Sequence, residues 1–325
     1  MNKNLSLQRI ITLASVLLLG AKTLAYVLTH SNAVLSDALE SLVNLAAAFM
    51  GLYSLQLSAK PRDSNHPYGH GKVEFLSAGI EGSLILFAGV LIIAKAIYNF
   101  FRPQQLGALD AGLIILASTG IINFVLGRMA VRQAKRGHSP ALLGSGRHLE
   151  SDAYSTFGVL AAVVLLYFFP YSWLDNGVAL LFGAVVSVMG FRVIRSAVAG
   201  IMDEADMHLL NQIIRFVNDR RRPAWVDLHN MRVIKYGAVL HVDCHLTLPW
   251  YYSVAQAHEE VHELRQVMMQ SVQNPVEFFI HTDACVPQHQ CRLCLLDSCP
   301  HRQHAFQMSQ QWTLETTLAD RKHGM

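Results

Sequence analysis

Charged residues are scarce in this 325-residue chain: 15% of the residues are Asp, Glu, Lys or Arg, whereas 52% are hydrophobic. A typical soluble domain is about 25% charged. The deficit lies in the first 200 residues, where apolar stretches each approach the ~20 residues that cross a bilayer. These stretches are residues 10–29, 33–57, 75–94, 111–127, 148–169 and 172–191. The composition excludes an ordinary soluble domain in this part of the chain and predicts six transmembrane helices.

A cleavage signal and a strong net charge are also missing. No small-residue cleavage site follows the first apolar stretch, so we expect a retained span and not a signal peptide. The formal net charge of +3 gives no reason to predict a nucleic-acid partner.

Lysine and arginine concentrate in the connections on one side of the predicted membrane. That side carries Lys3, Arg9, Lys60, Arg62, Lys72, Arg128, Arg132, Lys135, Arg136, Arg147, Arg192 and Arg195, and the other side carries Lys95 and Arg102. By the positive-inside rule, both termini are predicted to be cytoplasmic, in a multi-pass protein of the inner membrane.

The composition changes near residue 200, where the polar mixture of a soluble domain begins. Hydrophobic periodicity predicts helices over 207–219 and 254–270, and strands over 226–234, 239–248 and 276–280. This αββαβ order indicates a small cytoplasmic α+β domain. We therefore expect a six-helix transmembrane domain at 1–204, a cytoplasmic metal-binding domain at 205–285 and a Cys/His-containing tail at 286–325.

Two pairs of polar residues interrupt the predicted spans. Glu40 and Asn44 lie in the second, and His148 and Asp152 lie in the fifth. Each pair is spaced i, i+4, which places both side chains on one face of a helix. Ionisable groups at membrane depth are costly without a partner or a pathway. The two faces therefore predict a shared ion site.

Histidines concentrate in the predicted cytoplasmic part, which holds eleven of the sixteen. Several share a strand face or a helical turn: His241 with His245, His258 with His262, and His281 with Asp283. Imidazole together with carboxylate suits zinc-like divalent ions. Any one of these histidines is more commonly an ordinary surface residue, so the prediction depends on the joint pattern.

Four motifs in order resemble the cation diffusion facilitator family, in particular its bacterial zinc/proton antiporter branch. They are LESLVN at 39–44, DSNHPYGHGK at 63–72, HLESD at 148–152 and HTDAC at 281–285. The resemblance covers about residues 8–285. It implies six spans, a ferredoxin-like cytoplasmic domain, a homodimer and the exchange of a divalent metal for protons.

The resemblance implies a transport site made of Glu40, Asn44, His148 and Asp152. The usual zinc pattern of the family has aspartate at both second-span positions. Glutamate is one methylene longer, and neutral Asn44 offers an amide oxygen, so the metal preference is open. Asp37 lies on the same helical face and is a possible further ligand. The alternative is an interhelical hydrogen-bond cluster.

The resemblance also implies a metal site on a cytoplasmic loop, at Asp63, His66 and His70. The alternative is a solvated loop that Gly69 and Gly71 merely turn. Lys72 matches a family lysine that pairs with an aspartate after the sixth span, which here is Asp203.

The cytoplasmic domain is implied to hold a binuclear metal site at a dimer contact. Its ligands would be His229, His245, His258, His281 and Asp283. Metal binding there would stabilise the dimer by mass action. His241 and His262 match no ligand position of the family.

The tail departs from the family pattern with Cys285, Cys291, Cys294, Cys299, His301 and His304. The C-x-x-C spacing resembles that of zinc ligands, and disulfides are disfavoured in a reducing cytoplasm. An unstructured extension is the alternative. Cys244 lies in a predicted strand and is expected to pack in the core.

We predict a transporter that exports Zn²⁺ or another divalent transition metal, in exchange for protons, and not an enzyme. Protons would return to the ligands when the ion leaves. The alternative is a membrane-tethered metal sensor without transport. A metallohydrolase is a weaker third reading, because the sequence shows no general base apart from the metal ligands.

Overall fold

The computed structural model describes residues 2–29, 32–101, 110–168, 172–272 and 274–324. Some side chains within the helices also lie outside this description, among them those of Asp37 and Glu40. The chain divides into two compact units, Met1–Met202 and Asp203–Met325.

The first unit consists of long helices. They are α1 (Asn2–Thr29), α2 (Asn32–Ser58), α3 (Val73–Phe101), α4 (Asp110–Gly137), α5 (Pro140–Phe168) and α6 (Ser172–Ile201). Each contains between 27 and 30 residues. At about 1.5 Å per residue, each is long enough to cross a hydrocarbon core of about 30 Å.

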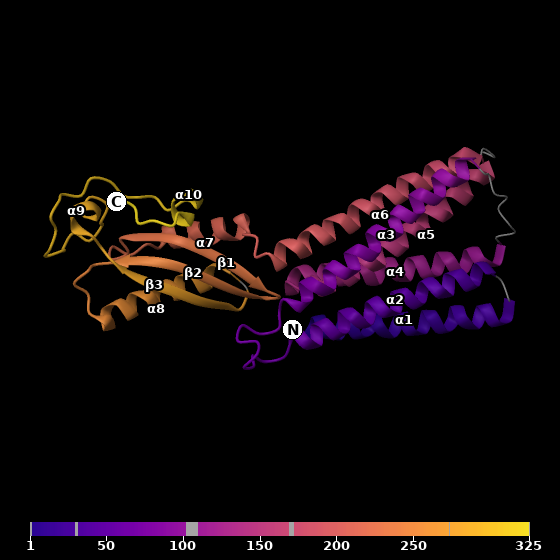
Figure 1. The fold of residues 1–325 in the computed structure, drawn as a ribbon, viewed down its shortest axis with the longest axis horizontal. Helices are drawn as coiled ribbons and strands as arrows, with labels where there is room; N and C mark the ends of the chain where they lie inside the picture. The colour runs from indigo at the N-terminus through magenta and orange to yellow at the C-terminus, as the bar shows by residue number, and fades with distance from the viewer. Residues whose placement is uncertain (1, 30–31, 102–109, 169–171, 273, 325) are drawn as a thin grey trace. The chain divides into compact units, whose positions relative to one another are not determined.

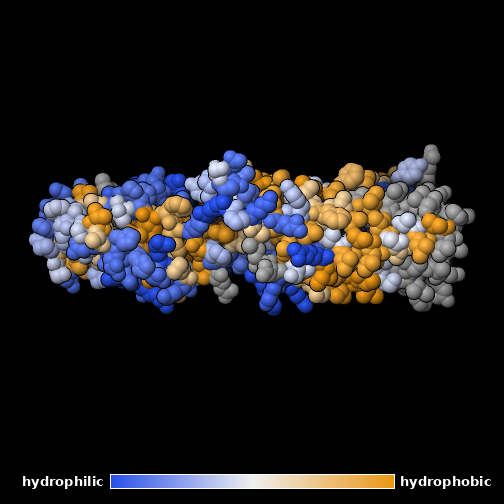
Figure 2. All heavy atoms as spheres, turned by 90° about the horizontal axis from the view of Figure 1, so that it is seen from below, coloured by the Kyte–Doolittle hydropathy of each residue, from blue (hydrophilic) through white to orange (hydrophobic). Residues whose placement is uncertain are grey.

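Within the described residues, three helical segments are both long and apolar enough to cross a membrane. They are Lys3–Ala21, Val73–Phe101 and Asn176–Ile201. On the face shown in Figure 2, hydrophobic residues are frequent over the described part of this unit, and hydrophilic residues are frequent over the second unit. Three of the six predicted spans are thus supported by composition, and the count of six stays a prediction.

The helices of the first unit pack chiefly in pairs. Helix α3 packs against α6, α4 against α5, and α1 against α2 (Figure 1). The α3–α6 contact is close: a Cβ atom at Gly89 would lie 2.7 Å from the backbone nitrogen of Ser187. Small residues commonly permit such an approach between membrane helices.

The second unit has the predicted αββαβ order. Its elements are α7 (Met207–Asp219), β1 (Asp227–Tyr236), β2 (Val239–Leu248), α8 (Val254–Ser271) and β3 (Val276–Ala284). Strand β2 is central, antiparallel to β1 and parallel to β3. Strand β3 continues beyond the predicted end at residue 280 because its pairing with β2 extends to Leu248 and Ala284.

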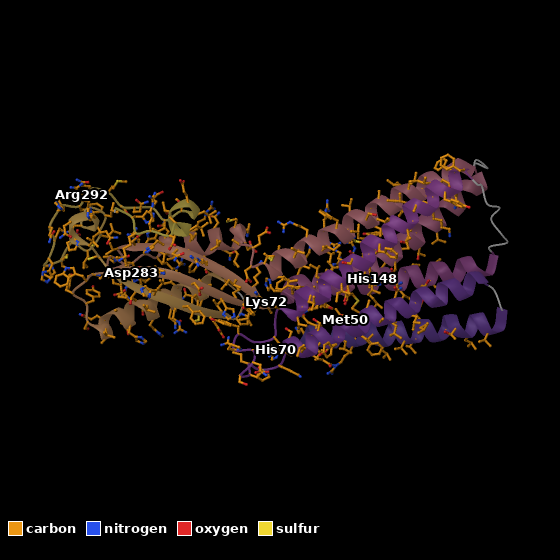
Figure 3. The ribbon with its side chains drawn as sticks, viewed as in Figure 1. Met50, His70, Lys72, His148, Asp283 and Arg292 are labelled. Atoms are coloured by element: carbon orange, nitrogen blue, oxygen red, sulfur yellow. The ribbon has the colours of Figure 1, made fainter. Side chains whose placement is uncertain are left out.

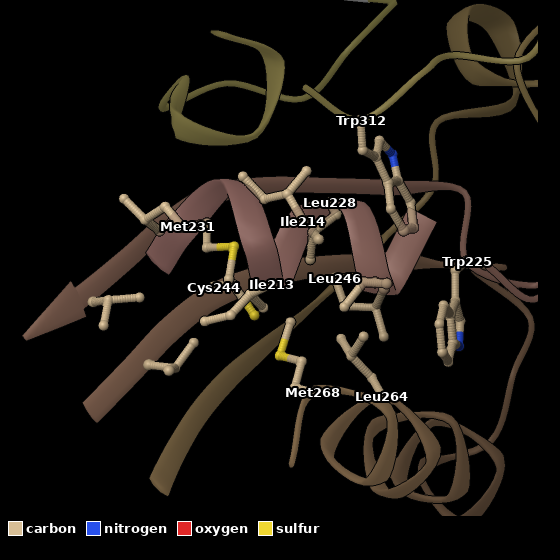
Figure 4. Close-up of a cluster of buried hydrophobic side chains, with 14 of the residues drawn as sticks. Ile213, Ile214, Trp225, Leu228, Met231, Cys244, Leu246, Leu264, Met268 and Trp312 are labelled. Carbon is tan, nitrogen blue, oxygen red and sulfur yellow. The ribbon is translucent and has the colours of Figure 1, made fainter. Parts of the chain in front are cut away.

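Alternation along β2 separates an apolar face from a polar one. Leu240, Val242, Cys244 and Leu246 are buried in a core that includes residues of α7 and α8 (Figure 4). The intervening residues, including His241 and His245, lie on the other face of the sheet. The expectation that Cys244 packs in the core is confirmed.

The tail packs on this same unit. It contains two short helices, α9 (Pro287–Gln290) and α10 (Leu314–Leu318). Trp312 is 3% exposed and belongs to the core cluster of the strands and helices (Figure 4). The backbone N–H of Asn230 on β1 donates to the carbonyl of Ala319 at 2.9 Å. The tail therefore completes the core, in contrast to an unstructured extension.

Candidate metal sites

A polar cluster joins α2 and α5 inside the helical unit. The amide nitrogen of Asn44 donates to Asp152 Oδ2 at 2.8 Å. His148 Nε2 lies 2.9 Å from Asn44 Oδ1 and 4.0 Å from Asp152 Oδ2. The His148 and Asp152 side chains are only 10% and 16% exposed. Three of the four residues assigned to the transport site thus meet, and their metal binding stays a prediction.

Two acidic residues of this prediction, Glu40 and Asp37, have side chains outside the described residues. Their backbone lies in α2, and Glu40 precedes Asn44 by one helical turn. Their part in the site stays a prediction.

Glu150 lies in the same motif as His148 and Asp152 but has other partners. Its carboxylate is fully buried and lies 2.6 Å from Arg147 and 3.4 Å from Arg128. These two guanidinium groups compensate the buried charge. Glu150 therefore connects α5 with α4, and the geometry does not add it to the ligand set.

The loop before α3 gathers its three predicted ligands. Asp63 Oδ1 lies 3.0 Å from His66 Nδ1, and Asp63 Oδ2 lies 3.4 Å from His70 Nε2. The two imidazole rings are 4.3 Å apart. Gly69 has φ of 89°, in the left-handed region that glycine adopts without strain. One ligand atom from each of the three residues falls within 4.8 Å of the others.

Hydrogen bonds favour the ionised form of Asp63. Desolvation raises its pKa, but hydrogen bonds from the His66 ring and from the backbone N–H groups of His66 and Asn65 outweigh this and lower it. The ionised form is the one that coordinates a cation.

Lys72 lies in the first unit and Asp203 in the second. The ion pair between them stays a prediction.

In the second unit, strand register places three histidines side by side. His229 of β1 pairs with His245 of β2, and His245 pairs with His281 of β3. Asp283 joins this row: its Oδ2 lies 3.0 Å from His245 Nδ1 and 3.5 Å from His229 Nε2. His281 Nε2 lies 3.9 Å from Asp283 Oδ1. Figure 3 marks Asp283, together with His148 and His70 from the other two candidate sites.

His229, His245 and Asp283 form the compact part of this row, because their ligand atoms fall within 4.8 Å of one another. The predicted ligand His258 lies exposed on α8, outside that group. A second ion at this site would therefore require His258 and His281 to move towards the other three ligands, or it would require ligands from another subunit.

Three residues beside this row were not predicted from the sequence. Asp227 Oδ2 lies 3.3 Å from His229 Nδ1, and Asp227 Oδ1 lies 2.7 Å from His323 Nδ1. Lys322 Nζ lies 3.2 Å from Asp283 Oδ1. Asp227 stands two residues before His229 on one strand, a spacing that could have identified it. Lys322 and His323 carry no such signal, since the fold of the tail brings them there.

These contacts keep both aspartates ionised. Burial raises the pKa of Asp283, but hydrogen bonds from His245 and Lys322 hold it below its ordinary value. Burial likewise raises the pKa of Asp227, and hydrogen bonds from His229 and His323 lower it overall.

The two histidines that match no family ligand differ from each other. His241 is 3% exposed. Its ring lies 4.8 Å from that of Tyr236 and 6.3 Å from that of Phe279, and its Nδ1 lies 3.4 Å from Glu277. His262 is exposed on α8, beside Gln266.

Comparison with known protein families decides the identity. Residues 9–202 match the cation efflux transmembrane domain, and residues 205–285 match the cation efflux protein cytoplasmic domain. The chain belongs to the cation diffusion facilitator family. The members of this family are transporters that cross a membrane, and this chain has the transmembrane and cytoplasmic domains of such a cation efflux protein.

Similar proteins include an uncharacterized transporter, a cation-efflux pump and a manganese efflux protein. An uncharacterized transporter of Synechocystis is 31% identical over 76% of this chain and 79% of its own length. The cation-efflux pump FieF of Pectobacterium carotovorum is 26% identical over 87% and 96%, respectively. The manganese efflux system protein MneS of Bacillus subtilis is 23% identical over 80% and 89%.

The match to the family's cytoplasmic domain ends at Cys285, so most of the tail lies beyond it. The tail cysteines nevertheless approach one another. Cys285, Cys291, Cys294 and Cys299 all line one cavity, together with His301. His304 is exposed and does not line it.

Proposed function

We propose that this cation diffusion facilitator exports a zinc-like divalent ion from the cytoplasm in exchange for protons. The observation that carries this proposal is the cluster of Asn44, His148 and Asp152 between α2 and α5. The buried imidazole of His148 and the partly buried carboxylate and amide of Asp152 and Asn44 supply the ligand types that a divalent ion needs when it loses its water. Glu40, one turn before Asn44, completes the proposed site.

The ligand set bears on the choice of metal. The imidazole of His148 suits zinc, iron and nickel, whereas the oxygen ligands of Asn44 and Asp152 also suit manganese. Zinc remains our first candidate. Manganese is the second, supported by the neutral oxygen of Asn44 and by the name of the relative MneS.

Proton exchange follows from the same groups. A bound cation favours the deprotonated forms of His148 and Asp152, and its departure favours their protonation. Each metal released would therefore return protons to the site, which couples metal flux to a proton gradient.

The framework of the proposal has six spans, cytoplasmic termini and a homodimer. The lengths of α1 to α6, each at least 27 residues, support six crossings. The bias of lysine and arginine supports the orientation. Within the dimer, we propose that Lys72 pairs with Asp203 and that the histidine row of the cytoplasmic domain binds regulatory metal.

Flux into proteoliposomes tests the function. Vesicles that contain the purified protein should accumulate zinc, with manganese, iron, cobalt and cadmium compared in parallel, while a trapped dye reports proton movement. Asp152→Asn keeps the size of the side chain and removes its charge, so it should abolish the flux.

Thr156→Val is the matched control, because the Thr156 hydroxyl donates to the carbonyl of Asp152 on the same helix at 2.9 Å and is not among the proposed ligands. It should leave flux near that of the parent. Metal binding without flux in the parent protein would favour the sensor alternative, and normal flux in Asp152→Asn would refute the assigned site.

A further inference from the structure

Four cysteines surround one small cavity at the end of the sheet. Cys285 follows β3, and Cys291, Cys294 and Cys299 lie on the turns around and after α9. The cavity they line is about 20 Å³. A cavity of about 15 Å³ accommodates one water molecule, so this space suits a single small ion.

Each sulfur has a hydrogen-bond donor directed at it. The backbone N–H of Gln303 donates to Cys291 Sγ at 3.4 Å. Backbone amides of Trp250 and Leu296 hydrogen-bond to Cys285 and Cys294, respectively. The Tyr251 hydroxyl hydrogen-bonds to Cys299. A neutral thiol is a weak acceptor, whereas a metal-bound thiolate gains from such donors.

The surrounding loop is held by one cation. The guanidinium of Arg302 donates to the carbonyls of Cys291, Cys294 and Leu296 at 3.0, 3.1 and 2.7 Å. These bonds fix the backbone of the C-x-x-C turn, and the positive charge of Arg302 lies near the sulfurs. The charge of Arg302 acts to lower the pKa of Cys294, but burial outweighs it and raises the pKa of both Cys285 and Cys294, so an ion that binds these groups must displace their protons.

Two other uses of the cysteines differ from a zinc site. A disulfide would join two of the sulfurs and give no role to the other two. It is also disfavoured in a reducing cytoplasm. An iron–sulfur cluster also takes four thiolates, and it is distinguished from zinc by its iron and sulfide content. A tetrahedral set of four sulfurs around one ion is typical of structural zinc.

We propose that Cys285, Cys291, Cys294 and Cys299 bind one structural zinc ion that fastens the tail to the end of β3. No three of these sulfurs lie within 4.8 Å of one another in the described chain. Since Zn–S bonds are about 2.3 Å, the turn contracts around the ion when it binds. This inference does not depend on transport.

The ion would act on the rest of the unit through the tail. Beyond the cysteines, the tail supplies Trp312 to the core and Lys322 to Asp283. A fixed turn at 291–299 shortens the free chain before these contacts, which reduces the entropy lost when they form. The zinc thus stabilises the arrangement of the tail beside the histidine row.

Cobalt substitution of the full-length protein tests the site. Thiolate ligands give Co²⁺ an intense near-ultraviolet charge-transfer absorption that histidine and carboxylate ligands do not give. We expect this absorption in the parent protein and its loss in Cys291→Ser, Cys294→Ser. Cys244→Ala is the matched control, because it removes the one cysteine outside the cavity and should keep the absorption.

A second measurement uses the parent protein alone, so it does not depend on the folding of the variant. A mercurial reagent that titrates thiols should release a single zinc ion per chain, detected with a chelating dye. The inference is overturned if the parent releases no zinc with its thiols or shows no cobalt–thiolate absorption. Iron with sulfide, or a disulfide in protein purified under reducing conditions, would overturn it equally.

Discussion

The helical unit (residues 1–202) and the cytoplasmic unit (residues 203–325) bring together similar ligands with different secondary structure. In the helical unit, i, i+4 spacing on α5 aligns His148 with Asp152, and the neighbouring α2 brings Asn44 to them. In the cytoplasmic unit, strand register aligns His229, His245 and His281 across three strands. The first cluster depends on how two helices pack, whereas the second depends on a hydrogen-bonded sheet.

This difference suits two kinds of metal handling. Two helices can shift relative to each other without breaking their backbone hydrogen bonds, so ligands shared between them can separate and release an ion. Neighbouring strands cannot slide without breaking the ladder. A site shared among strands therefore keeps its geometry, and it suits an ion that is held for stability or regulation.

The largest difference in metal flux is expected when ligands are removed from each of the two sites. In the helical unit, His148→Ala should lower metal flux in proteoliposomes more than about 100-fold, beyond the 10- to 100-fold typical for residues that merely support a ligand. In the cytoplasmic unit, His245→Ala combined with Asp283→Ala should leave measurable flux, because those residues are proposed to regulate the protein.

His262→Ala is the control for the cytoplasmic variant, since His262 is an exposed histidine of the same unit that matches no ligand position. Equal loss of flux in His148→Ala and in the cytoplasmic double variant would break the distinction between the two sites.

A second prediction concerns stability. Zinc bound at the histidine row should stabilise the isolated unit at residues 203–325 against urea, by about 2.7 kcal/mol at a free zinc concentration 100 times the Kd of that site. The His245→Ala, Asp283→Ala variant should lose this gain and keep any gain from zinc at the cysteines. Its unfolding curve, measured with and without zinc beside that of His262→Ala, checks the assignment. An unchanged zinc response would contradict it.

The fragment for this experiment must include the tail, because the tail contributes to the core of the unit. The sequence did not predict this contribution. A fragment that ends at residue 290 would lack Trp312, which is 3% exposed in the core. Loss of such a side chain from a core costs about 3–5 kcal/mol. Long-range packing of this kind follows no local period, so an irregular, cysteine-bearing segment gave no indication of where its tryptophan would lie.

Local periodicity was more informative elsewhere. The i, i+4 pairs predicted which residues of α5 face α2, and alternation predicted which residues of β2 lie in the core. The αββαβ order was found because both helices and all three strands have distinct periods. The contacts of Lys322 and His323 could not be found this way, because they join positions almost 40 and 96 residues apart in the sequence.

A third prediction sharpens the role of the unusual amide in the helical unit. Asn44→Asp places a second carboxylate beside Asp152, so the two charges repel each other when no metal is bound. Proton uptake should therefore become easier, and the acid limb of the flux profile should move by about one unit to higher pH. Metal preference should shift with it.

Flux measured from pH 5 to 8 with zinc and manganese would check this effect, and Thr156→Val again serves as the control. An unchanged profile together with an unchanged metal preference would place Asn44 outside the coordination sphere.

The smallest effect is expected from Lys322, whose ammonium group lies 3.2 Å from Asp283 Oδ1. A cation at this place repels a metal bound to the same carboxylate. Lys322→Gln should therefore strengthen zinc binding to the cytoplasmic row at pH 7 by about 1 kcal/mol, or about fivefold, the scale of a charge pair at 4 Å in water.

Loss of Lys322 also removes one cause of the lowered pKa of Asp283. At pH 7 the Asp283 carboxyl is ionised with or without Lys322, so protons hardly compete with zinc for it. The change in zinc affinity therefore arises from the lost repulsion between Lys322 and the metal. A carboxyl with a lowered folded-state pKa adds stability above its unfolded-state pKa and loses it as the pH falls through the folded-state value. The variant should thus be slightly less stable than the parent without zinc at pH 7, and the difference should vanish in acid.

Competition with a zinc-binding dye measures the zinc affinity of Lys322→Gln. Arg321→Gln removes a neighbouring, exposed cation and should leave the affinity unchanged. Weaker zinc binding in Lys322→Gln would show that the lysine supports the site instead of opposing the metal.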